Sequence, residues 1–292
     1  MYYLIYGLLY AISLLPMFVL YGISNVIYVL LFYVFKYRKP LVKANLKIVF
    51  PNKSEAERLI IAKQFYKNFI DSFVETIKLF STGKNFINSR CEADYSLFEY
   101  LYKQGKPFQI HACHQFNWEI INYHFSIHAP QTILGVYMPL SNKSFERIFL
   151  KIRQRYNTTM LPATEMKNKF TTWRTKPHAL VLVADQNPGH PKTSYWFNFF
   201  GKPTPFIIGP ERYARDKNCP VLFAKSIKLS RGKYKVLFEL VTENAAELAP
   251  TQLTQKFVQF ITNTITEQPE NWLWSHRRFK WNWQLEYGEV LG

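Results

Sequence analysis

The chain has 292 residues, enough for one large domain or two small ones, and its content of 48% apolar and 17% aromatic residues excludes a disordered, collagen-like or low-complexity protein. Lys and Arg number 37 against 20 Asp and Glu, and the resulting net charge of +17 favours polyanionic partners such as nucleic acid, anionic lipid head groups or acidic carrier proteins. Cys91, Cys113 and Cys219 are spaced too irregularly for a disulfide framework or a zinc site, which indicates a reducing compartment.

Residues 1–35 are predicted to anchor the chain to a membrane, because they contain no charged residue and no histidine. As one helix this stretch would measure about 50 Å at roughly 1.5 Å per residue, whereas the hydrocarbon core is about 30 Å thick. Pro16 and Gly22 are possible breaks. The stretch therefore forms either a spanning helix with an interfacial extension or two shorter segments that enter and return, and we favour a single anchor.

The charges around the apolar stretch predict which side of the membrane the rest of the chain occupies. Lys36, Arg38, Lys39, Lys43 and Lys47 all follow it, whereas a secretory signal peptide carries its positive charges first. By the positive-inside rule, residues 36–292 lie in the cytoplasm, beside the anionic leaflet. The alternative is a buried core helix of a soluble protein.

Residues 36–292 are predicted to form one α/β domain. Ser54 and Glu57 have the spacing of a capping box, and apolar residues at intervals of three or four follow them to Phe80, which predicts an amphipathic helix. Short apolar runs predict strands, and polar stretches between them predict helices. This alternation favours a mixed, mostly parallel sheet covered by helices. The predicted strands are 107–113, 131–137, 179–184, 219–224 and 234–241, and the helices are 143–156, 165–176, 206–217 and 250–267.

His114 and Glu119 are the first candidates for chemistry, since ligands of open α/β sheets bind beyond the carboxyl ends of strands. A histidine leaving a strand and a carboxylate five residues later can meet across the turn. Glu119 would then bond one ring nitrogen and leave the other free to act as a base. The substrate would supply the nucleophile, a hydroxyl or an amine. Taken alone, the pair is also compatible with a structural histidine in a loop, and Cys113 is better placed for packing than as a nucleophile.

The C-terminal segment is rich in tryptophan and cations: Trp272, Trp274, His276, Arg277, Arg278, Lys280, Trp281 and Trp283. Such a cluster can stack nucleic-acid bases. We favour packing of the tryptophans on the core with the cations at a membrane face, because Trp and Arg also suit a lipid interface. The sequence has no nucleotide-binding glycine loop and no paired-cysteine or His-Glu-x-x-His metal motif, so we expect no metal and no organic cofactor.

Read together, these segments resemble the bacterial lipid A biosynthesis acyltransferases, a branch of the lysophospholipid acyltransferase superfamily. The resemblance covers nearly the whole chain. It lies in the apolar N-terminus and in an ordered series of segments: Asn45-Leu46, Phe50-Pro51, His114-Gln115-Phe116-Asn117-Trp118-Glu119, Arg153-Gln154-Arg155, Ala184-Asp185-Gln186-Asn187-Pro188-Gly189, Phe199-Phe200-Gly201 and Trp272-Leu273-Trp274-Ser275-His276-Arg277-Arg278.

The resemblance implies a role for each matching residue. His114 would be the catalytic base and Glu119 the acid that orients it. Substrate-binding positions would be Arg155, Asp185, Gln186 and Gly189. Asp185 has an equally plausible structural reading, as a cap or a support for the turn at Pro188-Gly189. The chain departs from the usual family pattern at Phe116, Met138, Asn157 and Asn187, which changes the walls and charges around the acceptor.

The expected activity is transfer of a fatty acyl chain to a hydroxyl of a phosphorylated glycolipid, the lipid A precursor. The donor implied by the resemblance is acyl-acyl carrier protein, an acidic partner that suits the basic chain, with acyl-CoA as the alternative. The expected location is the cytoplasmic side of the bacterial inner membrane, with anionic lipid and no nucleic acid as partners. Two alternatives are a lysophospholipid or aminolipid acyltransferase and, from another class, a non-catalytic basic membrane protein.

Overall fold

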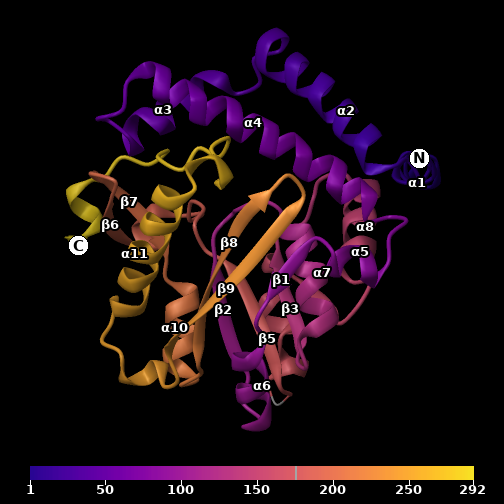
Figure 1. The fold of residues 1–292 in the computed structure, drawn as a ribbon. Helices are drawn as coiled ribbons and strands as arrows, with labels where there is room; N and C mark the ends of the chain where they lie inside the picture. The colour runs from indigo at the N-terminus through magenta and orange to yellow at the C-terminus, as the bar shows by residue number, and fades with distance from the viewer. Residues whose placement is uncertain (175) are drawn as a thin grey trace.

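A seven-stranded sheet forms the centre of the computed structural model, which describes residues 1–174 and 176–292 (Figure 1). Its strand order is β1-β9-β8-β2-β5-β3-β4, and every neighbouring pair is parallel except β8 with β9. The predicted α/β class with a mostly parallel sheet is confirmed. The strands are β1 (Cys91–Ala93), β2 (Phe108–Ala112), β3 (Thr132–Tyr137), β4 (Thr158–Pro162), β5 (His178–Val183), β8 (Val221–Ser230) and β9 (Lys233–Thr242).

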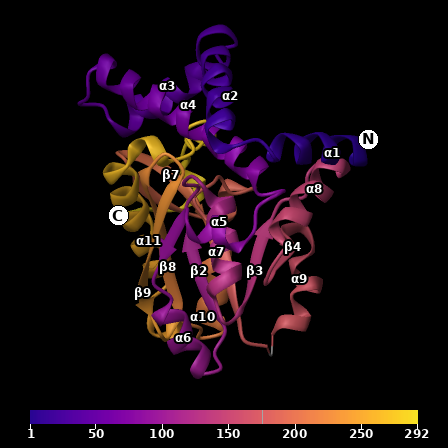
Figure 2. The ribbon, with the colours of Figure 1, turned by 45° about the vertical axis from the view of Figure 1, so that its right-hand side comes forward.

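Helices cover both faces of this sheet, as the 45° view shows (Figure 2). Neighbouring residues of one strand serve the two faces: Leu222 belongs to an apolar cluster that includes residues of α6, α7 and α8, whereas Phe223 belongs to another that includes residues of α10 and α11. The helices that follow residue 80 are α5 (Lys84–Asn88), α6 (Ser96–Lys103), α7 (Trp118–His128), α8 (Lys143–Arg153), α9 (Met166–Lys169), α10 (Gly209–Asp216) and α11 (Gln252–Glu267). The helix expected over 165–176 consists of short pieces, with α9 followed by a 3-10 turn at Thr171–Trp173, and residue 175 lies outside the described residues.

A small second sheet, with strand order β10-β6-β7, was not predicted. It contains β6 (Ser194–Phe199), β7 (Lys202–Ile207) and β10 (Val290–Leu291). Phe200 and Gly201 join β6 to β7 and both have positive φ, 53° and 75°, as a two-residue hairpin of type I′ requires. The helix predicted over 206–217 therefore begins three residues late, at Gly209.

Residues 2–78, about the first quarter of the chain, form a layer of helices over one end of the main sheet. This layer consists of α1 (Tyr2–Ser13), α2 (Met17–Val29), α3 (Lys39–Val49) and α4 (Glu55–Lys78). Ser54 and Glu57 close the predicted capping box of α4, with Ser54 Oγ accepting from the Glu57 amide at 3.2 Å. Pro16 separates α1 from α2, whereas Gly22 lies within α2.

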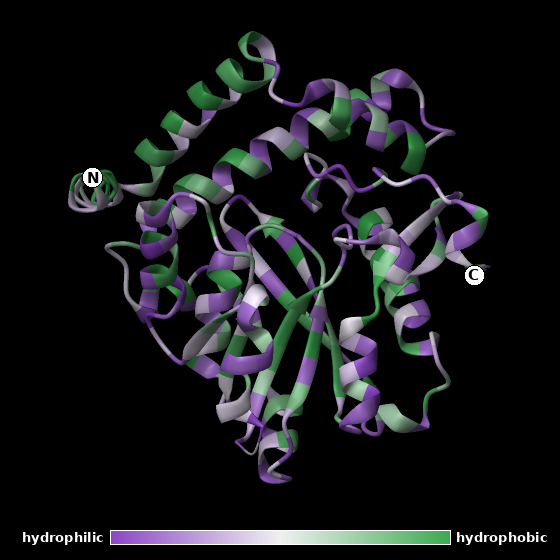
Figure 3. Ribbon diagram, turned by 180° about the vertical axis from the view of Figure 1, so that it is seen from behind, coloured by the Kyte–Doolittle hydropathy of each residue, from purple (hydrophilic) through white to green (hydrophobic). Residues whose placement is uncertain are grey.

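The continuous helix Met17–Val34, which is α2 with its π-helical end Leu30–Val34, is long and apolar enough to cross a membrane. Only 17% of it is buried in the protein. Most of it is coloured hydrophobic in the view from behind (Figure 3). By length and composition it is the counterpart of the predicted anchor.

Candidate active site

The candidate site lies just beyond the carboxyl ends of two neighbouring strands, β2 and β5. Their parallel register pairs Ala112 with Val183, the last residue of each strand. His114 and Asp185 each come two residues after these strand ends, so the register brings them face to face. The bond from the Ala184 amide to the Ala112 carbonyl, at 3.0 Å, continues the pairing beyond the strands.

Asp185 holds the His114 side chain and its backbone at once. Its Oδ1 is 2.6 Å from His114 Nδ1, and its Oδ2 accepts from the His114 amide at 3.0 Å and from Trp272 Nε1 at 2.7 Å. Asp185 is buried, which on its own would raise its pKa, but the adjacent His114 and these hydrogen bonds lower the pKa to about 2. Asp185 is therefore ionised, and its carboxylate accepts a hydrogen bond from the protonated Nδ1 of His114.

With its proton on Nδ1, His114 has an unprotonated second ring nitrogen, Nε2, whose lone pair can accept a hydrogen bond. Gln186 Nε2 donates to it at 3.0 Å. His114 and Gln186 both line a cavity of about 530 Å³, so Nε2 lies where a substrate hydroxyl can replace the Gln186 amide. This arrangement, a carboxylate on Nδ1 and a free base at Nε2, is that of a general-base histidine.

The cavity lining is mostly apolar with a few polar side chains, a composition that suits a fatty chain with a reactive end. Side chains with polar atoms in the lining include His114, Trp118, Glu119, Arg153, Gln186 and Asn187. Most of the remaining lining is apolar and comes from the main sheet and α7. It includes Ile121, Phe125, Gly135, Val136, Met160, Val181, Val183, Ala224 and Val236.

The predicted hydrogen bond between Glu119 and His114 is wrong, because both ring nitrogens of His114 have other partners. Glu119 instead accepts from Arg153 Nε at 3.0 Å on each carboxylate oxygen, and from Trp118 Nε1 at 3.1 Å. Asn117 caps α7 by accepting from the Glu119 amide at 3.0 Å. The Glu119 carboxylate is therefore held by Arg153, the last residue of α8, rather than by the imidazole.

The arginines differ from the expectation as well. Arg153 lines the cavity and pairs with Glu119, whereas Arg155 donates to the Leu79 carbonyl at 2.8 Å. Six site residues were predicted, and three of them, His114, Glu119 and Gln186, line the cavity in the described part of the chain. Asp185 lies behind His114, and Gly189 lies in the loop between β5 and β6.

Trp272 is a site residue that the sequence analysis placed only among packing residues. Its segment runs beside the His114 loop: the Leu273 amide donates to the His114 carbonyl at 3.1 Å, and the Phe116 amide to the Asn271 carbonyl at 3.1 Å. The motif Trp-Leu-Trp is the signal that could have found it, since alternate tryptophans on an extended segment point to the same side.

Trp272→Phe is expected to lower turnover about tenfold, because Asp185 loses one of the donors that hold it while the aromatic packing remains. Steady-state kinetics should show the loss in kcat rather than KM. Trp274→Phe is the matched control, since Trp274 donates to the Pro269 carbonyl instead. Equal kinetic losses in both variants would show that Trp272 acts through packing alone.

The cations of the C-terminal cluster do not all lie at a surface. Trp272 and Trp274 are buried as expected, but Arg278 is also fully buried. It donates to Asn187 Oδ1 at 3.2 Å and to the Pro205 carbonyl at 2.9 Å, and it lies 4.3 Å from the centre of the Phe206 ring. Burial lowers the pKa of Arg278 to about 9. Through its two hydrogen bonds, Arg278 joins the loop at Asn187 to β7 of the second sheet.

The chain matches a family model described as bacterial lipid A biosynthesis acyltransferase over residues 1–281. The match covers the N-terminal helices and every residue of the site described above. The comparison with curated proteins gives no match.

Proposed function

The chain belongs to the bacterial lipid A biosynthesis acyltransferase family, and from this premise we propose that it moves a fatty acyl chain from an acyl thioester to a hydroxyl of a lipid A precursor. The observation that carries the proposal is the His114–Asp185 pair, with His114 in the lining of a mostly apolar cavity. A non-catalytic lipid-binding protein would have no use for a histidine held in one tautomer by a buried carboxylate.

In the proposed reaction, His114 Nε2 takes the proton of the acceptor hydroxyl while that oxygen attacks the thioester carbonyl. The tetrahedral intermediate then collapses, the carbon–sulfur bond breaks, and the thiolate leaves with the proton that His114 returns. Asp185 stabilises the imidazolium between these steps, which the 2.6 Å contact with Nδ1 allows. General-base help of this kind contributes about 10²–10⁴-fold.

We assign the Glu119–Arg153 pair to substrate positioning. Arg153 lines the cavity, and Glu119 holds it there through both carboxylate oxygens. A guanidinium fixed in this way can contact a phosphate of the acceptor with its remaining donors. Glu119 would thus act on the substrate through Arg153 and not on the histidine.

The proposed acceptor is a phosphorylated glycolipid at the cytoplasmic face of the inner membrane. The surplus of Lys and Arg, +17 overall, is complementary to its phosphates, to anionic lipid and to an acidic acyl carrier protein as donor. Acyl-CoA is the alternative donor, and a lysophospholipid or an aminolipid the alternative acceptor.

The experiment supplies the purified protein in detergent with labelled acyl-acyl carrier protein or acyl-CoA and one acceptor at a time. Mass spectrometry of the lipid product should show one added acyl chain on the lipid A precursor. Addition only to lysophospholipid or aminolipid would overturn the proposed acceptor. No transfer to any of them would favour the non-catalytic alternative.

The cavity wall formed by β3 and β4 predicts the preferred chain length. A Cβ added at Gly135 would lie 2.8 Å from Met160 Sδ, so Gly135→Ala must push the flexible Met160 side chain aside, narrowing the cavity. Met160→Ala should widen it. We expect Met160→Ala to raise the ratio of kcat/KM for longer over shorter acyl donors about tenfold, and Gly135→Ala to lower it. Competition between donors of different lengths measures the ratio, and an unchanged ratio in both variants would place the acyl chain elsewhere.

A further inference from the structure

The helix α2 has two different sides. Residues four apart, Leu20, Ser24, Tyr28 and Phe32, are buried against the protein. The opposite side, together with the outer side of α1, exposes large apolar groups. We call this the outer apolar face, and its most exposed members are Tyr3, Leu4, Leu8, Phe18, Val26 and Val29.

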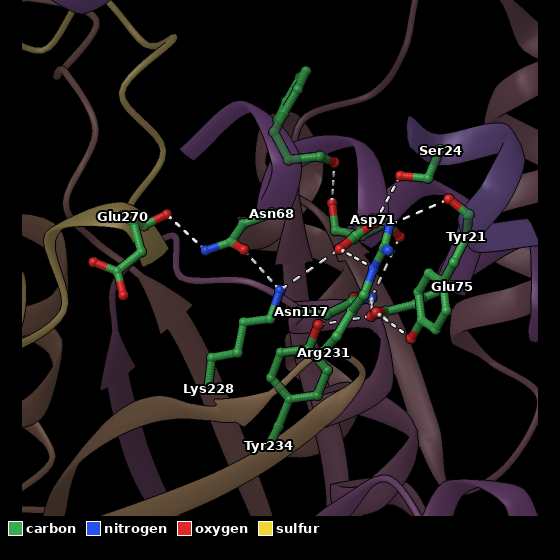
Figure 4. Close-up of polar contacts among 12 residues, drawn as sticks. Tyr21, Ser24, Asn68, Asp71, Glu75, Asn117, Lys228, Arg231, Tyr234 and Glu270 are labelled. Carbon is green, nitrogen blue, oxygen red and sulfur yellow. Dashed lines mark hydrogen bonds and ion pairs between the residues drawn. The ribbon is translucent and has the colours of Figure 1, made fainter. Parts of the chain in front are cut away.

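The buried side of α2 is joined to charged groups of α4 and of the β8–β9 hairpin (Figure 4). Ser24 Oγ donates to Asp71 Oδ1 at 2.6 Å, and Tyr21 donates to Glu75 Oε1 at 3.0 Å. Arg231, from the turn between β8 and β9, donates to both oxygens of Asp71 at 2.9 and 2.6 Å and to Asn25 Oδ1 at 3.0 Å. These contacts lie in the first half of the apolar segment Met17–Val34.

The contacts continue along both helices. At one end, Lys78 Nζ donates to the carbonyls of Ser13 and Leu15 at 2.8 and 2.9 Å, and at the other the rings of Phe32 and Tyr66 are 5.3 Å apart. α2 and α4 therefore run antiparallel, side by side, over the full length of α2, as the front and back views agree (Figures 1 and 3).

This pairing makes a membrane-crossing orientation of α2 expensive. If α2 stood upright in the bilayer, α4 would enter with it and bring Lys67, Asp71 and Lys78, and the hairpin would bring Arg231. A charged side chain at the centre of a bilayer costs about 2.5–3.5 kcal/mol by insertion scales. A helix lying flat avoids that cost, because its outer side enters the lipid while its inner side stays on the protein.

We infer that α1 and α2 lie flat in the cytoplasmic leaflet, with the outer apolar face in the lipid, and that the chain does not cross the membrane. The inference rests on the proposed membrane location. It replaces the expected spanning anchor with an in-plane one, and it places the N-terminus on the same side as the catalytic site.

The charges around the outer apolar face favour lipid over a second copy of the chain as its occupant. Exposed cations border it on several elements: Lys36 after α2, Lys67 on α4, and Arg147 and Lys151 on α8. Arg147 and Lys151 lie 4.2 Å from the rings of Tyr2 and Tyr6, so α1 rests on them. Such a border matches anionic head groups. Two copies with a net charge of +17 each would repel one another.

A flat helical layer also brings the leaflet close to the reaction. Glu75, whose helix pairs with α2, accepts from Asn117 Nδ2 at 3.0 Å, and Asn117 caps the helix that carries Glu119. α8, on which α1 rests, ends at Arg153 in the cavity lining. A lipid acceptor could therefore reach His114 with its chains still in the leaflet.

Topology is tested on the full chain with a protease-cleavable epitope tag before Met1. The tag should resist protease in intact spheroplasts and be removed in inverted membrane vesicles. Removal in intact spheroplasts would show a spanning helix and overturn the inference. Release of the full chain from washed membranes into the soluble fraction would overturn the inference as well. Acyl transfer is measured separately in detergent, so failure of the orientation is distinguishable from failure of the proposed function.

The outer apolar face is tested by binding to vesicles of phosphatidylethanolamine and phosphatidylglycerol. Val26, which is 61% exposed, is changed to Glu, and Leu285, 85% exposed but outside α1 and α2, is the matched control. Val26→Glu should weaken vesicle binding about tenfold or more, and Leu285→Glu should leave it unchanged. Equal binding by both variants, or a dimer that Val26→Glu dissociates without vesicles, would assign the face to another occupant.

Discussion

His114→Ala and Asp185→Asn are each expected to reduce kcat for acyl transfer by about 10²–10⁴-fold. The first removes the base itself. The second leaves the shape of the site intact but replaces the carboxylate that accepts the Nδ1 proton at 2.6 Å with an amide that can donate to Nδ1 instead. The imidazole would then carry its proton on Nε2, where the substrate hydroxyl must be deprotonated. Single-turnover kinetics with a labelled acyl thioester measures the loss.

Glu119→Gln separates the two possible partners of His114. Since Glu119 pairs with Arg153, its replacement should raise KM for the phosphorylated acceptor more than it lowers kcat. A collapse of kcat in Glu119→Gln, with near-normal turnover in Asp185→Asn, would restore the original pairing of His114 with Glu119. Thermal unfolding of all three variants controls for loss of structure.

The contrast between Glu119 and Asp185 shows where sequence reasoning ends. Glu119 is five residues from His114 along the chain, so local spacing suggested it. Asp185 is 71 residues away, and its proximity depends on β2 and β5 being neighbours in a parallel register, which no local pattern reveals. The histidine itself was found because its motif follows a short apolar run that is a strand.

Elements were predicted where the apolar pattern was strong. The five expected strands correspond to β2, β3, β5, β8 and β9, and the capping box gave the start of α4. The second sheet was missed because β7 contains Pro203 and Pro205, which are unusual inside a strand but tolerated here, since β7 is an edge strand of this small sheet. Arg155 was expected to bind substrate from the resemblance alone, whereas Arg153, the last residue of α8, lines the cavity.

Glu75→Ala is expected to lower the free energy of unfolding by about 3 kcal/mol or more. Glu75 lies in the interior between α2, α4, α7 and β9, where Tyr21, Asn117 and Tyr234 donate to its carboxyl oxygens at 3.0, 3.0 and 2.7 Å. Alanine would leave these buried groups without their acceptor. Because Asn117 caps α7 beside the site, we expect turnover to fall as well. Denaturant unfolding and acyl transfer measure the two effects.

Glu75→Gln is the matched variant, and its behaviour depends on the charge of Glu75. Burial raises the pKa of Glu75 above its usual 4.5, even though the hydrogen bonds from Asn117 and Tyr234 oppose the shift. A raised pKa means that the folded state holds the proton more tightly than the unfolded state. The stability from this group is therefore full below pH 4.5 and is lost as the pH rises through the folded pKa. Gln, a neutral isostere, should cost less than Ala, and the stability of the wild type relative to Glu75→Gln should fall with rising pH. If that difference instead grows with pH, the three donors stabilise an ionised carboxylate and outweigh the effect of burial.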